Sequence, residues 1–230
     1  AAVHVLLNGL KPGAPVEFDV RLDGAPVAGA EWCRLVDVPV EHNTGMRGSI
    51  EEKRGPNPHV VRRAPFRAYD AMAPVQTPVK APAETMALRL HLPVARDAAG
   101  GSRSFQLRLA SDERRRGLEF LVRVHPVEIP RIGPDSFNCT IWYSPDQMAS
   151  RHQLEPWSEP HWEMIARYAR LMARARQNTF LIPMRKVLTV QDGRIVLNAE
   201  RLGRLVKTFS DAGMHYIEGS CIGKRSKPSW

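Results

Sequence analysis

The chain has 230 residues, a formal net charge of +9 and 43% hydrophobic residues. This length and apolar content can fill one large core or two modest ones, which excludes disorder over most of the chain. No apolar run reaches the roughly 18 to 20 residues that a membrane-spanning helix needs, so a membrane is not an expected partner.

The positive charge does not indicate nucleic acid as a partner, because basic residues are spread over both halves of the chain. The one tight run, Arg114 to Arg116, follows Asp112 and Glu113 in a predicted turn. We therefore expect a solvated loop there. A basic interaction module is the least favoured reading of the chain.

The three cysteines, Cys33, Cys139 and Cys221, are far apart and lack CxxC spacing. They support neither a disulfide framework nor a zinc site, and we expect no metal and no cofactor. The first ten residues lack the basic-then-apolar layout of a signal peptide. The location stays open: secreted or periplasmic if a signal peptide was removed, otherwise cytoplasmic.

Residues 1–130 predict a β-sandwich domain, because several segments alternate apolar and polar side chains with the period of a half-buried strand. These segments are Pro15 to Leu22, Ala87 to Leu92, Ser104 to Leu109 and Leu118 to Val124, the last two forming a hairpin across a charged loop from Ser111 to Gly117.

A proline-rich crossover interrupts this pattern at about residues 55–82. Its prolines exclude a helix or a central strand, and we expect an extended surface segment. They are Pro56, Pro58, Pro65, Pro74, Pro78 and Pro82. The polar stretch from Glu41 to Arg54 before it is predicted to be an ordered loop.

After Pro134 the period changes to that of helices alternating with short strands. The predicted elements are a strand from Phe137 to Trp142, a helix from Ser158 to about Gln177, a strand from Thr179 to Met184, a hairpin over Val187 to Leu197, a helix from Asn198 to Gly213, and a strand from His215 to Glu218.

Strands separated by helices predict parallel pairing. Residues 134–230 therefore predict the first part of a TIM-type (β/α)8 barrel, and a complete barrel needs about 250 residues. The fold class is multi-domain, an N-terminal β-sandwich followed by an incomplete barrel. We expect the remainder of the same protein, or another copy, to complete it.

Four segments carry a recognisable pattern: Glu41 to Gly45, Asn57 to Phe66, Leu154 to Trp162 and His215 to Ser220. Together they resemble the corresponding segments of glycoside hydrolase family 123 proteins. The resemblance implies a β-sandwich before a (β/α)8 barrel, and a glycan as the substrate. It also implies hydrolysis of β-linked N-acetylhexosaminides, in which the acetamido oxygen of the substrate attacks the anomeric carbon beside an adjacent Asp-Glu pair.

The only Asp-Glu dipeptide of the chain, Asp112-Glu113, lies in the predicted sandwich hairpin. We do not transfer the catalytic role to it. The catalytic residues remain unknown, and we expect this chain alone to be inactive. The alternative is a non-catalytic carbohydrate-binding or scaffold protein. An acidic pair at the end of a later strand would support the enzyme, and the absence of such a pair would support this alternative.

Barrel enzymes bind their substrates at the carboxyl ends of the strands, which selects four candidate substrate-binding residues. Trp142 and Tyr143 could stack on a sugar ring or pack in the protein. Arg185, at the base of the hairpin, could bind hydroxyl or anionic groups. Glu218 could accept hydrogen bonds from two sugar hydroxyls or form a structural salt bridge.

Overall fold

The computed structural model describes residues 1–46 and 49–222 and is rich in sheet, with some helices. The chain divides into two compact units, Ala1–Glu128 and Ile129–Trp230. Within the described ranges, no helix combines the length and the apolar character that crossing a membrane requires.

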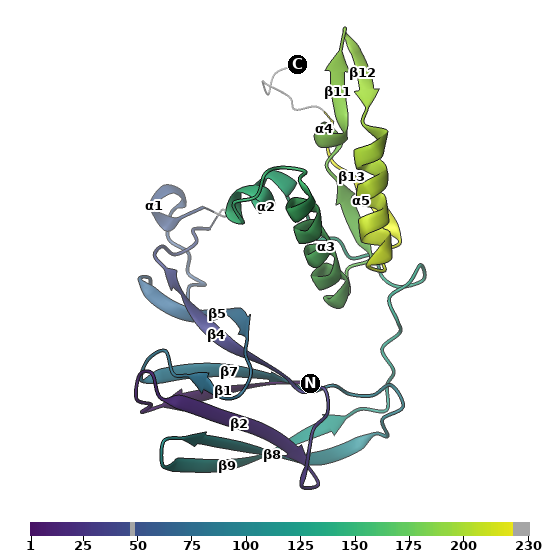
Figure 1. Ribbon diagram of the computed structural model, residues 1–230. Helices are drawn as coiled ribbons and strands as arrows, with labels where there is room; N and C mark the ends of the chain where they lie inside the picture. Colours follow the sequence, from purple (N-terminus) through teal and green to yellow (C-terminus); the bar gives the residue numbers. More distant parts are fainter. Residues whose placement is uncertain (47–48, 223–230) are drawn as a thin grey trace. The chain divides into compact units, whose positions relative to one another are not determined.

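The first unit consists of two antiparallel sheets that form two layers (Figure 1). The first sheet contains, in spatial order, β1 (Ala2–Asn8), β7 (Thr85–His91), β4 (Glu31–Val40) and β5 (Phe66–Pro74). The second contains β3 (Ala25–Pro26), β2 (Pro15–Leu22), β8 (Gly101–Ser111) and β9 (Arg114–Val124), and β6 (Val79–Lys80) also pairs with β2. The short helix α1 (Glu51–Arg54) lies between β4 and β5 in the chain.

Apolar side chains from both sheets fill one interior. Val16, Phe18 and Val20 of β2 are at most 3% exposed, while the residues between them are not buried. This burial agrees with the period-two pattern of the sequence. From the other sheet, Met86 and Leu88 of β7 join Val16 and Phe18 in one cluster.

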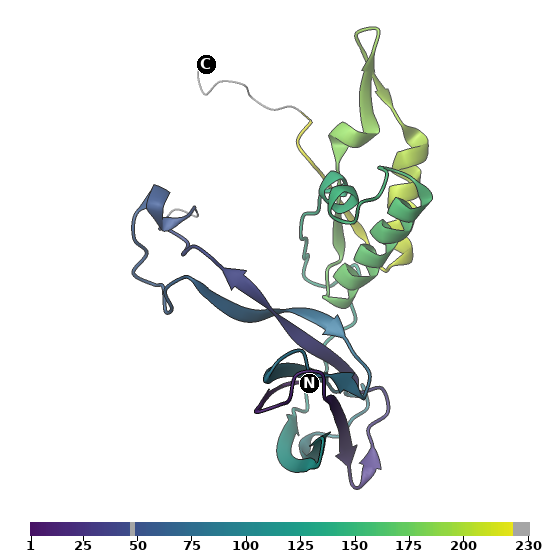
Figure 2. The same cartoon turned by 60° about the vertical axis from the view of Figure 1, so that its left-hand side comes forward.

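Two parts of the first unit differ from the sequence prediction. Strands β8 and β9 pair without a break from Gly101 to Ser111, so the turn holds only Asp112 and Glu113, and the three arginines belong to β9. The proline-rich segment contains the unpredicted edge strand β5 (Figure 2). The prolines do not prevent this strand, because Pro65 precedes it and Pro74 is its last residue.

The polar loop between β4 and β5 is organised around one carboxylate, that of Glu51. It accepts hydrogen bonds from the backbone N–H of Asn57 at 2.7 Å, the side-chain amide of Asn43 at 3.1 Å and the guanidinium of Arg63 at 2.7 Å. The Asn57 N–H contributes most to lowering the pKa of Glu51. These bonds connect described residues of the segment that the sequence predicted to be an ordered loop, whereas residues 47 and 48 lie outside the described residues.

The second unit alternates helices and strands. Its elements are α2 (Pro145–Arg151), α3 (Glu159–Arg174), β10 (Thr179–Ile182), α4 (Met184–Val187), β11 (Leu188–Gln191), β12 (Arg194–Leu197), α5 (Ala199–Asp211) and β13 (Tyr216–Gly219). Strands β10 and β13 are parallel, whereas β11 and β12 form an antiparallel hairpin. Both the parallel pairing and the hairpin were predicted.

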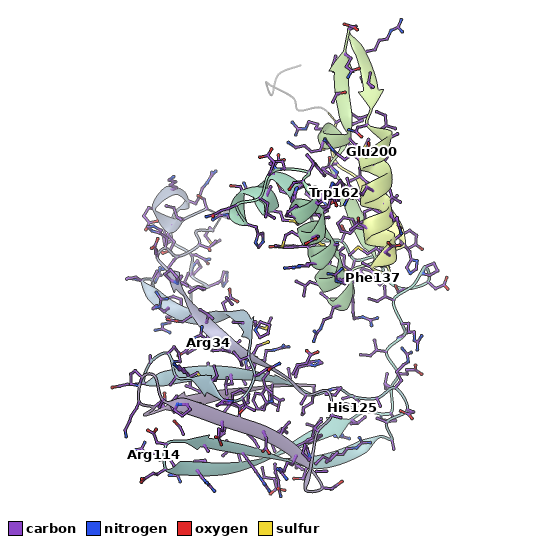
Figure 3. The ribbon with its side chains drawn as sticks, in the orientation of Figure 1. Arg34, Arg114, His125, Phe137, Trp162 and Glu200 are labelled. Atoms are coloured by element: carbon purple, nitrogen blue, oxygen red, sulfur yellow. The ribbon has the colours of Figure 1, made fainter. Side chains whose placement is uncertain are left out.

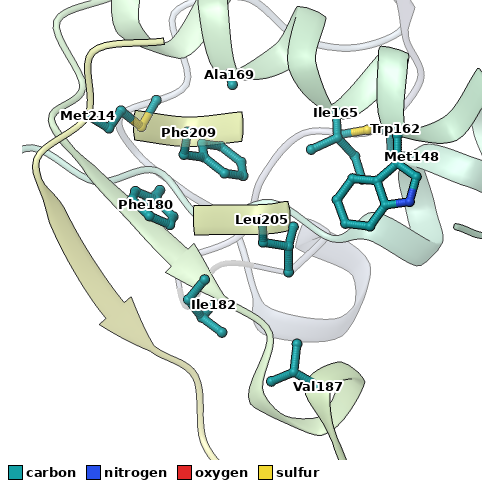
Figure 4. Packing of buried hydrophobic residues seen from close by; sticks show 10 residues of the cluster. All are labelled: Met148, Trp162, Ile165, Ala169, Phe180, Ile182, Val187, Leu205, Phe209 and Met214. Carbon is teal, nitrogen blue, oxygen red and sulfur yellow. The ribbon is translucent and has the colours of Figure 1, made fainter. Parts of the chain in front are cut away.

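Helices α3 and α5 pack on one face of β10 (Figure 4). The ring of Phe209 on α5 stacks on the ring of Phe180 on β10, with centroids 4.8 Å apart. Ile165 of α3 and Leu205 of α5 are fully buried in the same cluster. The 3.6-residue period of both helices in the sequence reflects this shared core.

Helix ends follow local sequence signals. The side chain of Asn198 accepts a hydrogen bond from the Arg201 N–H at 2.9 Å and so caps α5, as predicted. Ser158 precedes α3 but makes no side-chain cap, since its hydroxyl donates to the Glu155 carbonyl instead. Helix α2, which the sequence prediction missed, is capped by Ser144.

The segment Phe137 to Trp142 is not a strand, contrary to the prediction. The Cys139 carbonyl accepts hydrogen bonds from the backbone N–H groups of Asn178 and Thr179, and the Cys139 N–H donates to the Asn178 side chain at 2.8 Å. The Asn178 side chain thus takes the place of a strand ladder. The described part of this unit therefore has two parallel strands, where three were expected.

Replacing Asn178 with alanine tests this anchor. The buried amide also donates to the Ser136 hydroxyl at 3.1 Å. Its loss therefore leaves polar groups of the extended segment without their hydrogen-bond partner. We expect the free energy of unfolding to fall by about 2 kcal/mol, measured by urea denaturation. Gln147→Ala, at an exposed position of α2, is the control and should change little. Equal effects of the two substitutions would contradict the anchor.

His161 gives the second unit a dependence on pH. Its side chain is fully buried, its Nδ1 accepts a hydrogen bond from the Trp157 N–H at 2.8 Å, and burial lowers its pKa below the usual 6.5. The imidazole of His161 therefore binds a proton more readily in the unfolded chain than in the folded chain. We expect stability to fall as the pH drops below about 6.5, and His161→Gln to flatten this dependence in thermal melts. An unchanged slope in the variant would contradict this assignment.

Candidate functional site

Trp142 and Glu218 meet at the edge where the parallel strands end. The indole N–H of Trp142 donates to both carboxylate oxygens of Glu218, at 3.0 and 3.1 Å. Glu218 stands next to last on β13, opposite Leu181 of β10. The contact joins residues 76 positions apart in the chain, so two of the predicted site residues are brought together.

This edge keeps polar and aromatic surface available to a ligand. Trp142 is 68% exposed although its N–H is engaged. Glu218 shares a face of β13 with Tyr216, whose hydroxyl donates to the Pro134 carbonyl. The carboxylate has spare lone pairs that can accept hydrogen bonds from the hydroxyl groups of a ligand. The exposed indole ring beside it can stack on an apolar face of the same ligand.

Ser220 fixes the ends of the two strands relative to each other. Its backbone N–H donates to the Ile182 carbonyl at 3.0 Å, and its hydroxyl accepts from the Met184 N–H at 2.9 Å. The loop after β10 is therefore held to the loop after β13. No role for Ser220 could be predicted from the sequence, because its contacts depend on the parallel register of β10 and β13.

A second pair joins the two short helices that follow Trp142 and β10, α2 and α4. The Lys186 ammonium contacts the Asp146 carboxylate at 2.5 Å, and the Lys186 carbonyl accepts from the Arg201 guanidinium at 2.7 Å. Asp146 was not a candidate in the sequence analysis. The run Ser144-Pro145-Asp146 is a helix-start signal that could have located it, because it predicts a loop ending in a capped helix.

The other two predicted site residues lie differently. Arg185 is exposed and forms no ion pair with the residues that the structure describes, so its guanidinium is free to bind a ligand. Tyr143 faces the core: its ring lies 5.2 Å from the ring of Phe209, and burial raises the pKa of its hydroxyl. The structure does not bring Tyr143 to the edge where Trp142 and Glu218 meet.

The remaining acidic and metal-binding candidates lie elsewhere. Asp112 and Glu113 form the turn between β8 and β9 in the first unit. Within residues 1–46 and 49–222, no three His, Cys, Asp or Glu side chains are grouped so that they could hold a metal ion. Two surface hollows are also found in the first unit, both beside the β8–β9 hairpin.

Comparison with known proteins relates this part of the chain to one family. Residues 142–217 match the model of the glycoside hydrolase 123 catalytic domain. The matched segment starts at Trp142 and ends one residue before Glu218. No curated protein matches the chain.

The fold is similar to that of a family 123 glycoside hydrolase from Clostridium perfringens, a structure reported for the details of glycolipid glycan hydrolysis. The TM-score is 0.67 at 9% sequence identity, and the match covers 95% of this chain. It covers 41% of the other chain, so this chain spans less than half the length of that hydrolase. Residues 142–217 are thus similar to the catalytic domain of glycoside hydrolase family 123, and the fold of the chain is similar to that of a member of the same family.

Proposed function

We propose that this chain is part of a glycoside hydrolase that acts on β-linked N-acetylhexosaminides, and that it supplies one wall of the glycan-binding site. The observation that carries the proposal is the Trp142–Glu218 contact at the carboxyl ends of β10 and β13. Ligands of open and closed parallel sheets bind at this end of the strands. The match of residues 142–217 to the catalytic-domain model supports a role of this region in the glycan-binding site.

The proposal gives each group a chemical task. Trp142 stacks its exposed ring on the apolar face of a sugar, and its N–H holds the Glu218 carboxylate in place. Glu218 accepts hydrogen bonds from sugar hydroxyls through its remaining lone pairs. Arg185 binds a hydroxyl or an anionic substituent from the loop after β10.

The chemical step requires groups other than these. In the resemblance described above, an adjacent Asp-Glu pair orients the acetamido group and donates the proton. The only such pair in this sequence, Asp112-Glu113, lies in a turn of the first unit. We propose that this chain binds the glycan without cleaving it.

The same reasoning extends to the architecture. We propose that residues 1–130 form a β-sandwich domain, which the packing of two antiparallel sheets in the first unit supports. We also propose that residues 134–230 form the first part of a (β/α)8 barrel, which the parallel pairing of β10 and β13 and the packing of α3 and α5 on β10 support. The remainder of the protein, or another copy, would complete the barrel.

Glu218→Gln tests the site directly. The amide keeps the shape of the side chain but loses the charge that strengthens hydrogen bonds from sugar hydroxyls. We expect the affinity for a methyl β-N-acetylhexosaminide, measured by calorimetric titration, to fall about tenfold. Glu163→Gln, at an exposed position of α3, removes the same charge away from this edge and is the matched control. Equal affinities of the two variants would contradict the proposed site.

A nitrophenyl β-N-acetylhexosaminide tests the assignment of the chemical step. We expect the chain to bind this substrate and to release no nitrophenol above the uncatalysed rate. The double variant Asp112→Asn, Glu113→Gln should bind the substrate with unchanged affinity, since this pair lies in a turn of the first unit. Nitrophenol release that disappears in the double variant would show that the pair is catalytic and contradict the assignment.

A further inference from the structure

We propose that the first unit carries a binding site for a ligand with one anionic group on an aliphatic body, in a hollow beside the β8–β9 turn. The hollow has a volume of about 770 Å³, within the usual size range of small-molecule sites. It is lined by residues of the β1–β2 connection and of the β8–β9 hairpin. The inference does not depend on the proposed hydrolase function.

The register of β9 brings two arginines to the hollow. In the antiparallel pair, Arg116 stands opposite Leu109, and Arg114 stands opposite Ser111. Residues that face each other across a ladder lie on the same side of the sheet. Leu109 belongs to the core of this unit, so both arginines lie on the core side of β9, just beyond the last buried layer.

Neither guanidinium is neutralised by a carboxylate of the described residues. Arg114 donates to the Gly9 carbonyl at 3.2 Å, and Arg116 donates to the neighbouring Arg115 carbonyl at 3.2 Å. Both bonds have carbonyl acceptors, and each guanidinium group keeps further N–H donors that can bind a ligand. Arg114 lies at the exposed end of the hairpin (Figure 3).

The charge balance of the rim suits a single anionic group. The Lys11 Nζ atom lies 3.5 Å from Oδ2 of Asp112, and these two charges offset each other. The remaining charged residues of the lining are Arg114, Arg116 and Glu113, which leaves one net positive charge. A carboxylate or a sulfate would complete the hydrogen bonding of the guanidinium groups.

The apolar part of the lining determines which kind of ligand body fits the hollow. It is lined by the aliphatic side chains of Leu7, Leu10 and Leu109, and the described lining includes no aromatic ring. Sugar rings usually bind by stacking on an aromatic face. An aliphatic chain fits this lining better than a sugar does.

The run of three arginines supplies its own matched control. Arg115 stands opposite Ala110, on the other side of β9, and does not line the hollow. Arg114→Gln, Arg115→Gln and Arg116→Gln each remove one exposed positive charge from the same strand. A nonspecific effect of net charge would therefore be equal in the three variants.

Three probes with the same aliphatic chain test the site: octanoate, octyl sulfate and the neutral octyl glucoside, each below its micelle-forming concentration. Titration of the 230-residue chain is followed by the amide signals of Leu10 and Ala110 in NMR spectra. We expect both anions to bind saturably and to bind at least about tenfold more weakly in Arg114→Gln and Arg116→Gln. Arg115→Gln should bind like the parent chain.

Three outcomes would overturn the proposal. They are the absence of saturable shifts with either anion, equal affinity for octyl glucoside, and an Arg115→Gln variant as impaired as the other two. Far-UV circular dichroism of each variant distinguishes loss of binding from loss of folding. If Arg114→Gln fails to fold, Arg116→Gln decides, because Arg116 makes no bond to the β1–β2 connection.

Discussion

The second unit depends on one buried amide, that of Asn178. Its side chain is fully buried and accepts a hydrogen bond from the Cys139 N–H at 2.8 Å, while the backbone carbonyl of the same residue accepts from the N–H groups of His215 and Tyr216 at 2.9 and 3.0 Å. One residue thus joins the extended segment before α2 to the start of β10 and the start of β13. A buried polar group of this kind is tolerated only because nearly all its hydrogen bonds are made.

The candidate site follows from this anchor through chain geometry. Trp142 lies three residues beyond Cys139, and Glu218 lies two residues beyond Tyr216. Both segments are anchored at Asn178, and Trp142 and Glu218 meet where β10 and β13 end. Ser220 then locks that edge by bonding to Ile182 and Met184. The helices contribute from the other face, where Phe209 stacks on Phe180.

The sequence predicted what periodicity and turn chemistry control. The alternation in β2 and β8, the Asp192-Gly193 turn and the cap at Asn198 each depend on a few neighbouring residues, and the structure contains each of them. Strand β5 was missed because the surrounding prolines obscured it. The Phe137 to Trp142 segment was wrongly predicted as a strand because an apolar run does not reveal that the segment bonds to a side chain as well as to backbone groups and forms no ladder.

The positions of the candidate residues were predicted in part for the same reason. Parallel pairing is enough to place Glu218 at the edge, but its contact with Trp142 spans 76 positions and depends on two rotamers. Tyr143 was chosen as a neighbour of Trp142, yet successive side chains of an extended segment point to opposite sides. It therefore packs on Phe209 in the core. The Asp146–Lys186 pair needed the position of α2, which the sequence analysis did not predict.

The most direct test of the account is the indole N–H signal of Trp142 in NMR spectra during titration with a methyl β-N-acetylhexosaminide. Trp142 donates to Glu218 and is exposed, so a sugar bound at this edge must change the environment of that proton. We expect a saturable shift of this signal, with little change in the signals of the buried Trp162. A Trp142 signal that stays fixed while the glycoside binds elsewhere would contradict the account.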